Sequence, residues 1–169
     1  MAGIHTHQLT VPAEAIDANG HVNNLEYLHW MQDIAVAHSA ARGWGVERYQ
    51  AEGGTWVARS HYVEYLGAAF EGDALAVHTW VEEPGSSSWW RQYAIVRGGG
   101  GQADRGGPGS PGEVIVRAET LWVFVDLRSG RARRIPEGLR AAFEPATAET
   151  LRQLGLRPTI DGRGKSRRR

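Results

Sequence analysis

Residues 24–42 constrain the fold more than any other stretch, because nothing in them breaks a helix and apolar side chains surround all but one narrow stripe. Asn23 or Asn24 can cap the start of this helix, and Gly43 can end it. The polar positions of the stripe fall three and four apart, at Glu26, His29 and Asp33. So wide an apolar arc is typical of a helix enclosed on several sides, and we expect a central helix wrapped by a sheet.

The segments on either side of this helix have the pattern of strands. Alternation, β-branched and aromatic residues, and the turn residues between them predict strands at residues 5–11, 55–66, 75–82, 89–97 and 114–126. Residues 121–125, LWVFV, are apolar without interruption, which indicates a strand buried on both faces. The remaining patterns are compatible with short helical segments at residues 46–52, 136–143 and 148–154.

The order of these elements is a strand, a long helix and then four strands that can pair as consecutive antiparallel neighbours. This order predicts an α+β fold in which an antiparallel sheet of about five strands wraps one long central helix. The outer face of such a sheet stays open, so we expect the chain to self-associate.

The length of 169 residues fits one domain with a sizeable core. We expect that domain at residues 1–145, followed by a C-terminal extension with a basic, disordered tail at residues 146–169. Residues 98–112 hold eight glycines and two prolines, which predicts a flexible loop between two strands. A phosphate-binding loop is not expected there, because the Gly-Lys-Ser/Thr ending is missing and no helix follows.

Composition excludes several classes of protein and site. Five of the 19 basic residues lie in residues 163–169, which leaves 14 basic against 19 acidic groups elsewhere, so a folded basic face for nucleic acid is not expected. The absence of cysteine excludes a thiol nucleophile and a disulfide framework, and it fits a reducing compartment. With no signal peptide and no long apolar window, we expect a cytoplasmic protein without a membrane partner.

Residues 17–27, DANGHVNNLEY, gather reactive and hydrogen-bonding groups directly ahead of the predicted helix. They supply one carboxylate, one imidazole and three carboxamides, with Gly20 in the middle. The candidates for chemistry are Asp17, Asn19, His21, Asn23 and Asn24. Each has a structural alternative, since Asp and Asn commonly close turns or cap helices and the histidine can be an ordinary loop residue.

Three blocks of the sequence, at residues 17–30, 63–75 and 118–136, resemble the hot-dog-fold acyl-CoA thioesterases of the 4-hydroxybenzoyl-CoA thioesterase type. The resemblance covers roughly residues 5–145. It implies the hot-dog fold, in which the sheet wraps the long helix, and a hydrolase that splits acyl-CoA into a free acid and CoA.

The same resemblance implies roles for individual residues. Asp17 matches the catalytic carboxylate of the family, and the backbone N–H that binds the thioester oxygen falls by spacing on Asn24. The block also resembles that of plant acyl-ACP thioesterases, whose Asp-x-Asn-x-His arrangement is matched by Asp17, Asn19 and His21. One departure is Ala15, where many bacterial relatives have a second acidic residue.

The implied reaction needs no metal and no cofactor, since CoA is part of the substrate. A carboxylate just ahead of a helix can attack the thioester carbonyl or activate a water molecule, while free N–H groups of the first helical turn receive the developing charge. The sequence leaves both mechanisms open. His21 can orient Asp17 or contact substrate, and Asn19 and Asn23 can hydrogen-bond the carboxylate or water.

Aromatic and basic residues supply candidates for substrate binding. An acyl or aroyl pocket can be lined by Tyr27, Trp30, Trp56 and Tyr62, although aromatic residues are also common in small cores. The CoA phosphates can be met by Arg59 and Arg91, or both can be solvated strand residues. Glu64 is more simply a surface residue, and His5 and His7 lack a third ligand for a metal site.

We therefore expect a cytoplasmic acyl-CoA thioesterase that works as a dimer or a tetramer. An acyl-ACP thioesterase is the nearest enzymatic alternative, and a non-catalytic acyl-thioester-binding protein on the same fold is the alternative from another class. Hot-dog hydratases fit less well, because their signature has histidine five residues after the aspartate and His21 follows Asp17 by four.

Overall fold

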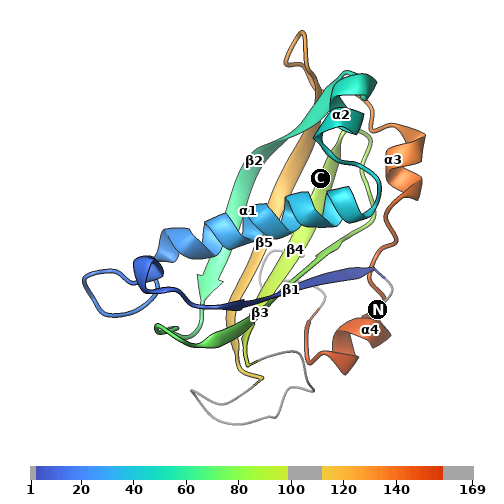
Figure 1. Cartoon of the computed structure of the whole chain (residues 1–169). Coiled ribbons are helices and arrows are strands. Elements are labelled where there is room, and N and C mark those ends of the chain that lie inside the picture. Colours follow the sequence, from blue (N-terminus) through green and yellow to red (C-terminus); the bar gives the residue numbers. More distant parts are fainter. Residues whose placement is uncertain (1–2, 99–111, 158–169) are drawn as a thin grey trace.

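The computed structural model describes residues 3–98 and 112–157, which form one antiparallel sheet with a long helix across one face (Figure 1). The strands are β1 (Ile4–Thr10), β2 (Gly54–Tyr65), β3 (Ala74–Val81), β4 (Ser88–Arg97) and β5 (Val114–Asp126). The helices are a 3-10 turn (Ala13–Ala15), α1 (Asn24–Ala41), α2 (Val46–Glu52), α3 (Glu137–Ala141) and α4 (Ala148–Gln153). The predicted α+β architecture is confirmed, and the predicted strands and long helix differ from the observed ones by one residue or less at each end.

The strand order in the sheet is β1-β3-β4-β5-β2, with every neighbouring pair antiparallel. Strands β3, β4 and β5 are consecutive neighbours as predicted, but the prediction was wrong for β2, which pairs with β5 rather than β3. The eight-residue connection 66–73 is long enough to allow this arrangement. Such a connection can span up to about 26 Å, whereas crossing three strand spacings needs about 14 Å.

One face of α1 packs onto the sheet and forms the main core. Its buried side chains there are Tyr27, Met31, Ile34 and Ala35. They meet sheet residues that alternate inward along β3 and β4, including Leu75, Val77, Tyr93 and Ile95. The opposite side of the helix is open, since Leu25 is 60% and Val36 53% exposed. The sheet lies along one side of α1, as the predicted wrapping by a sheet requires, but the described residues do not enclose the helix on several sides, because a single sheet layer covers only one of them.

A second core lies beyond the C-terminal end of α1, between the sheet, α2 and α3. Its buried members are mostly aromatic: Trp44, Val81, Trp89, Phe124, Ile135, Leu139 and Phe143. The short helix α3 contributes Leu139. Phe143, two residues after the end of α3, packs into the same cluster. This cluster builds the walls of the cavity described below.

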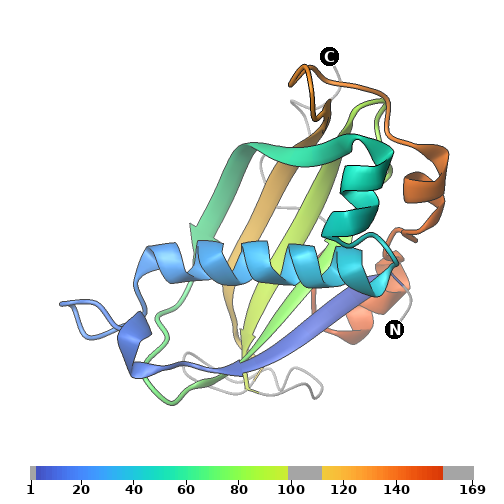
Figure 2. The same ribbon diagram turned by 45° about the horizontal axis from the view of Figure 1, so that its top comes forward.

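The outer face of the sheet is partly covered, contrary to expectation. Leu151 of α4 and Leu156 pack against Trp80, Ala94 and Val96 on the far side of the sheet from α1. Figure 2 shows α1 in front of the strands and α4 behind them. The stretch 121–125 is not buried on both faces as predicted, because Leu121, Val123 and Val125 remain partly exposed beyond the reach of α4.

The ends of β4 and β5 lie side by side, with the Arg97 N–H donating to the Glu113 carbonyl (2.9 Å) and the Gly112 N–H to the Arg97 carbonyl (2.7 Å). Most of the predicted flexible loop 98–112 and the predicted basic tail fall outside the described residues. Within the described ranges, no helix combines the length and the apolar character needed to cross a membrane.

Candidate active site

The loop before α1 is held in a fixed, hairpin-like shape. Ile16 pairs with Val22 across its base, and the Asp17 N–H donates to the His21 carbonyl (3.0 Å). The Gly20 N–H closes a turn onto the Asp17 carbonyl (3.0 Å), and Gly20 has a φ of +81°, which a residue with a side chain adopts only with strain. The Val22 N–H also donates to the Ala69 carbonyl (2.8 Å), which ties the loop to the connection between β2 and β3.

The Asp17 carboxylate is half-buried and caps its own turn. Its Oδ1 accepts from the Asn19 backbone N–H (2.8 Å) and its Oδ2 from the Asn19 side-chain amide (3.4 Å). The Asx-turn considered as the structural alternative is therefore present. It does not exclude chemistry, because each carboxylate oxygen can accept more than one hydrogen bond.

The first turn of α1 leaves one backbone donor open. The Asn23 side chain caps the helix by accepting from the Leu25 N–H (2.9 Å), and the Asn23 carbonyl accepts from the Glu26 N–H (2.9 Å). Across the described residues, the Asn24 N–H has no hydrogen-bond acceptor. Because it lies at the positive end of the helix dipole, it is suited to binding an anionic oxygen.

A pocket of about 260 Å³ opens beside this helix start. It is lined by His21, Val22, Asn24 and Tyr27, by Tyr65 at the end of β2, and by Leu66, Gly67 and Ala68 from the connection that follows. The Tyr65 hydroxyl donates to the Asn24 carbonyl (3.0 Å), and its ring lies 5.7 Å from that of Tyr27. Tyr65 was not among the residues predicted for the site, although it lies on the same face of β2 as Val63. Asp17, Asn19 and Asn23 belong to the loop that precedes α1, and they are not among the residues that line the pocket.

The other predicted substrate residues do not gather at this pocket. Trp30 packs edge-on against Tyr27, with ring centres 5.4 Å apart. On β2, the Tyr62 hydroxyl donates to Glu64 Oε1 (3.3 Å), and Arg59 is exposed. Trp56 and Arg91 lie elsewhere, in a second cavity at the other end of α1.

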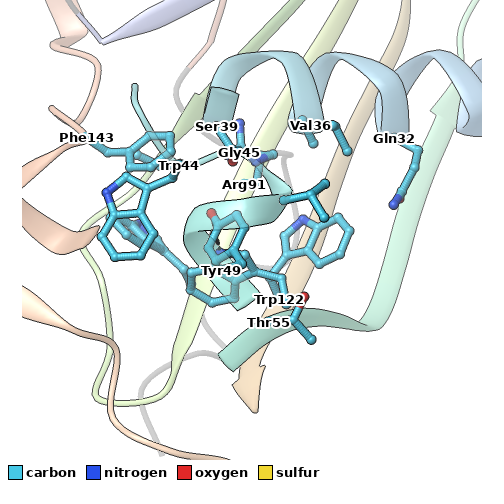
Figure 3. Close-up of a pocket in the computed structure, with 15 residues that line it drawn as sticks. Gln32, Val36, Ser39, Trp44, Gly45, Tyr49, Thr55, Arg91, Trp122 and Phe143 are labelled. Carbon is cyan, nitrogen blue, oxygen red and sulfur yellow. Dashed lines mark hydrogen bonds between the residues drawn. The ribbon is translucent and has the colours of Figure 1, made fainter. Parts of the chain in front are cut away.

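This second cavity has a volume of about 200 Å³ and lies under the C-terminal half of α1. Its walls carry six aromatic side chains, Trp44, Tyr49, Trp56, Trp89, Trp122 and Phe143. In Figure 3, Gln32, Val36 and Ser39 project from the helix along one side, and Trp44 and Phe143 stand at the end opposite Gln32. From Asn24 to Ser39 the helix rises about 22 Å, so the two sites of one chain are well separated.

Residues 11–143 match the family model of the thioesterase-like superfamily. The chain belongs to this superfamily. The family resemblance and the hot-dog fold expected from the sequence are thereby confirmed, since the matched region includes the loop with Asp17, α1 and all strands but β1.

The chain is also similar to curated proteins: it is 28% identical over 74 residues to a chloroplastic palmitoyl-acyl carrier protein thioesterase from Cuphea hookeriana. That match covers 44% of this thioesterase-like chain but only 15% of the plant protein. The chain thus spans a small part of the length of the curated relatives it matches.

Solved structures share the fold over most of this chain. A 1,4-dihydroxy-2-naphthoyl-CoA thioesterase from Synechocystis has a TM-score of 0.70 at 16% identity, covering 83% of this chain and 95% of that one. An acyl-ACP thioesterase from Bacteroides thetaiotaomicron has a TM-score of 0.70 at 20% identity, covering 83% and 52%. Within the part of this thioesterase-like chain that the structure describes, no group of three His, Asp or Glu side chains is arranged to hold a metal ion.

Proposed function

We propose that this protein hydrolyses acyl thioesters to a free acid and a thiol, using Asp17 and the start of α1. The observation that carries the proposal is the open Asn24 N–H at the head of an 18-residue helix, following a rigid turn that carries the Asp17 carboxylate. A carboxylate and a fixed oxyanion donor are the two groups that thioester hydrolysis requires. Membership of the thioesterase-like superfamily supports the same chemistry.

Two mechanisms fit these groups. In the first, an Asp17 oxygen attacks the thioester carbon, the carbonyl oxygen takes up negative charge against the Asn24 N–H, and the C–S bond breaks to release the thiolate and leave an anhydride that water hydrolyses. In the second, Asp17 removes a proton from water, the resulting hydroxide adds to the same carbon, and the C–S bond then breaks to release the thiolate and the free acid. In both, the two Asn19 donors hold the carboxylate in its orientation.

The acyl chain and its carrier are further parts of the proposal. Tyr27 and His21 line the pocket beside the helix start, and Trp30 backs Tyr27, so these residues are candidates for contact with the substrate. CoA is the proposed carrier, with exposed Arg59 as a candidate for its phosphates. Arg91 is too deeply buried for a solvated phosphate. An acyl carrier protein is the alternative carrier, which the likeness to a plant palmitoyl-ACP thioesterase favours.

The test is hydrolysis of a panel of aliphatic and aromatic acyl-CoAs, and of one acyl chain on both carriers, followed with a thiol reagent. We expect turnover by the wild type and loss of turnover in Asp17→Asn, which keeps the shape of the side chain. Glu14→Gln is the matched control, because it removes an exposed carboxylate three residues away. Full activity of Asp17→Asn would overturn the site, and a bound, unhydrolysed acyl-CoA would favour a non-catalytic binding protein.

Self-association is also part of this proposal. Three features support it: β2 is an edge strand, Val57 on it is 49% exposed, and Leu25 and Val36 leave one side of α1 apolar and open. Sedimentation over a range of concentrations should give a dimer or a tetramer. A monomer at every concentration would contradict this expectation.

A further inference from the structure

Arg91 is a buried cation without a carboxylate partner in the described structure. Its side chain projects from β4 toward α1, and the residue is only 7% exposed. Its Nη1 donates to His38 Nδ1 (2.9 Å) and to Thr79 Oγ1 (3.3 Å), both uncharged acceptors. Within residues 3–98 and 112–157, Arg91 forms no ion pair with Asp or Glu. A buried charge is costly unless an opposite charge or a full set of hydrogen bonds compensates it.

Some N–H groups of the Arg91 guanidinium form no hydrogen bond within the described residues. A guanidinium has five N–H groups, and the two contacts above use only Nη1. Nε and Nη2 donate to no group in the described parts of the chain. Burial lowers the pKa of Arg91, and only Tyr93 and Tyr49 oppose that shift. The ring of Phe143 lies 5.7 Å from the guanidinium carbon, so the group is held in place by its surroundings.

The space next to this cation suits a flat apolar group. Arg91 lines the cavity of about 200 Å³ whose walls carry six aromatic side chains. A protein cavity of about 150 Å³ admits a benzene molecule, so this one has room for a single aromatic ring with a small substituent. Gln32, Val36 and Val46 line the same cavity and are exposed, so the cavity opens to solvent between α1 and α2.

We propose that this cavity binds a free aromatic carboxylate, with the ring between the aromatic walls and the carboxylate on Arg91. Carboxylates match the planar guanidinium fork in two parallel hydrogen bonds, which fits the unused Nε and Nη2. The cavity lies about 22 Å along α1 from the open N–H of Asn24 in the same chain, so the carbonyl of a thioester bound in the cavity would not reach that N–H. The proposed ligand is therefore a free acid. The proposal stands independently of thioester hydrolysis, since it uses none of the residues around Asp17.

The test compares benzoate with benzamide, its neutral isostere, on the full-length protein. Quenching of tryptophan fluorescence reports occupancy, because four of the cavity's walls are tryptophans, and calorimetry gives the affinity. We expect benzoate to bind saturably. We expect the affinity for benzamide to be lower than that for benzoate by roughly tenfold or more, because benzamide loses the charge-assisted contact. Equal affinities, or no saturation by either compound, would overturn the proposal.

Variants assign the preference to Arg91. Arg91→Met should remove the preference for benzoate over benzamide, while Arg131→Gln, which neutralises an exposed arginine just after the turn that follows β5, should retain it. Val46→Trp provides an independent check, because Val46 is exposed at the opening of the cavity and the larger ring narrows that opening. This variant should bind benzoate more weakly than the wild type, and it tests the cavity even if Arg91→Met does not fold. Wild-type affinity in Val46→Trp, or an undiminished preference in folded Arg91→Met, contradicts the assignment.

Discussion

The two ends of α1 carry opposite kinds of site. At the start, the functional groups are backbone N–H groups and polar side chains from one short loop, partly open to solvent. At the far end, they are buried and partly buried aromatic rings and one buried arginine, contributed by helices, strands and the segment after α3. The first site depends on local backbone geometry and the second on long-range packing. They should therefore respond to different perturbations.

The largest expected effect separates the two ends by function. Asp17→Asn should lower the turnover of an acyl thioester by about 10²–10⁴-fold, the range for loss of a catalytic base. It should leave benzoate affinity unchanged, because the Asp17 carboxylate accepts hydrogen bonds from Asn19 in its own turn and Asp17 does not line the aromatic cavity. Kinetics and calorimetry on one preparation check both. A parallel loss of benzoate affinity would mean that the two ends are one site.

Stability should respond in the reverse way, with the aromatic end the more sensitive. Phe143→Ala should lower the free energy of unfolding by about 3 kcal/mol, because the ring packs on His38, Trp89 and Arg91. Phe70→Ala is the control, since Phe70 is 50% exposed in the connection between β2 and β3, near the polar end. It should change stability by less than about 0.5 kcal/mol. Similar values from urea unfolding would remove the contrast.

Acid should act at His38, which packs on Phe143 at the aromatic end, and at His78, which hydrogen-bonds Thr6 where β3 pairs with β1. Burial, and next the charge of Arg91, lowers the pKa of His38 to about 3, and burial lowers that of His78 to about 4. Both stay neutral in the folded protein below their ordinary pKa of 6.5, whereas the unfolded chain takes up protons. Stability should therefore fall as the pH drops from about 6.5 toward 4, by at most about 1.4 kcal/mol per pH unit for each histidine.

His38→Gln tests this assignment, because the amide oxygen can still accept from Arg91 but does not titrate. The pH dependence of unfolding should become shallower in this variant and not vanish, since His78 keeps its share. His29→Gln, at an exposed position of the same helix, is the matched control and should retain the wild-type slope. An equal slope in all three proteins would contradict the role of His38.

The smallest effect belongs to the start of the helix. Asn23→Ala removes the cap on the Leu25 N–H and should cost about 1 kcal/mol of unfolding free energy. Asn24→Ala, one position later, keeps every backbone group and should cost less. If the two variants are equally stable, the cap contributes nothing measurable, and the local order of this end has another source.

The same contrast explains how far the sequence could predict the molecule. The turn at Asp17, the cap at Asn23 and the helix start at Asn24 depend on residues close together in the chain, so their positions followed from spacing and turn chemistry. The cavity depends on residues from Gln32 to Phe143, which only the packed fold brings together. Trp56 and Arg91 were therefore predicted as substrate-binding candidates, but the residues that surround them in the cavity were not predicted as a group.

The position of β2 was the main error of topology, and it too is a long-range effect. Alternation of side chains identifies a strand and its buried face but contains no information about its neighbour. The exposed residues Leu25 and Val36 on α1 were misjudged for a related reason, since an apolar arc does not say which molecule covers it.

The pairing of β2 with β5 also sets the order of events during folding. Gly54 pairs with Asp126, 72 positions further along the chain, whereas Val81 on β3 pairs with Arg91, only ten positions away. Closing the longer loop costs more chain entropy and slows the search, so we expect β3 and β4 to form a hairpin before β2 joins the sheet. Pulse-labelling hydrogen exchange should protect β2 amides after those of β3 and β4, and protection of β2 before β3 and β4 would contradict this sequence of steps. Until β2 arrives, β5 presents an unpaired edge, which is the stage of folding most exposed to association with other chains.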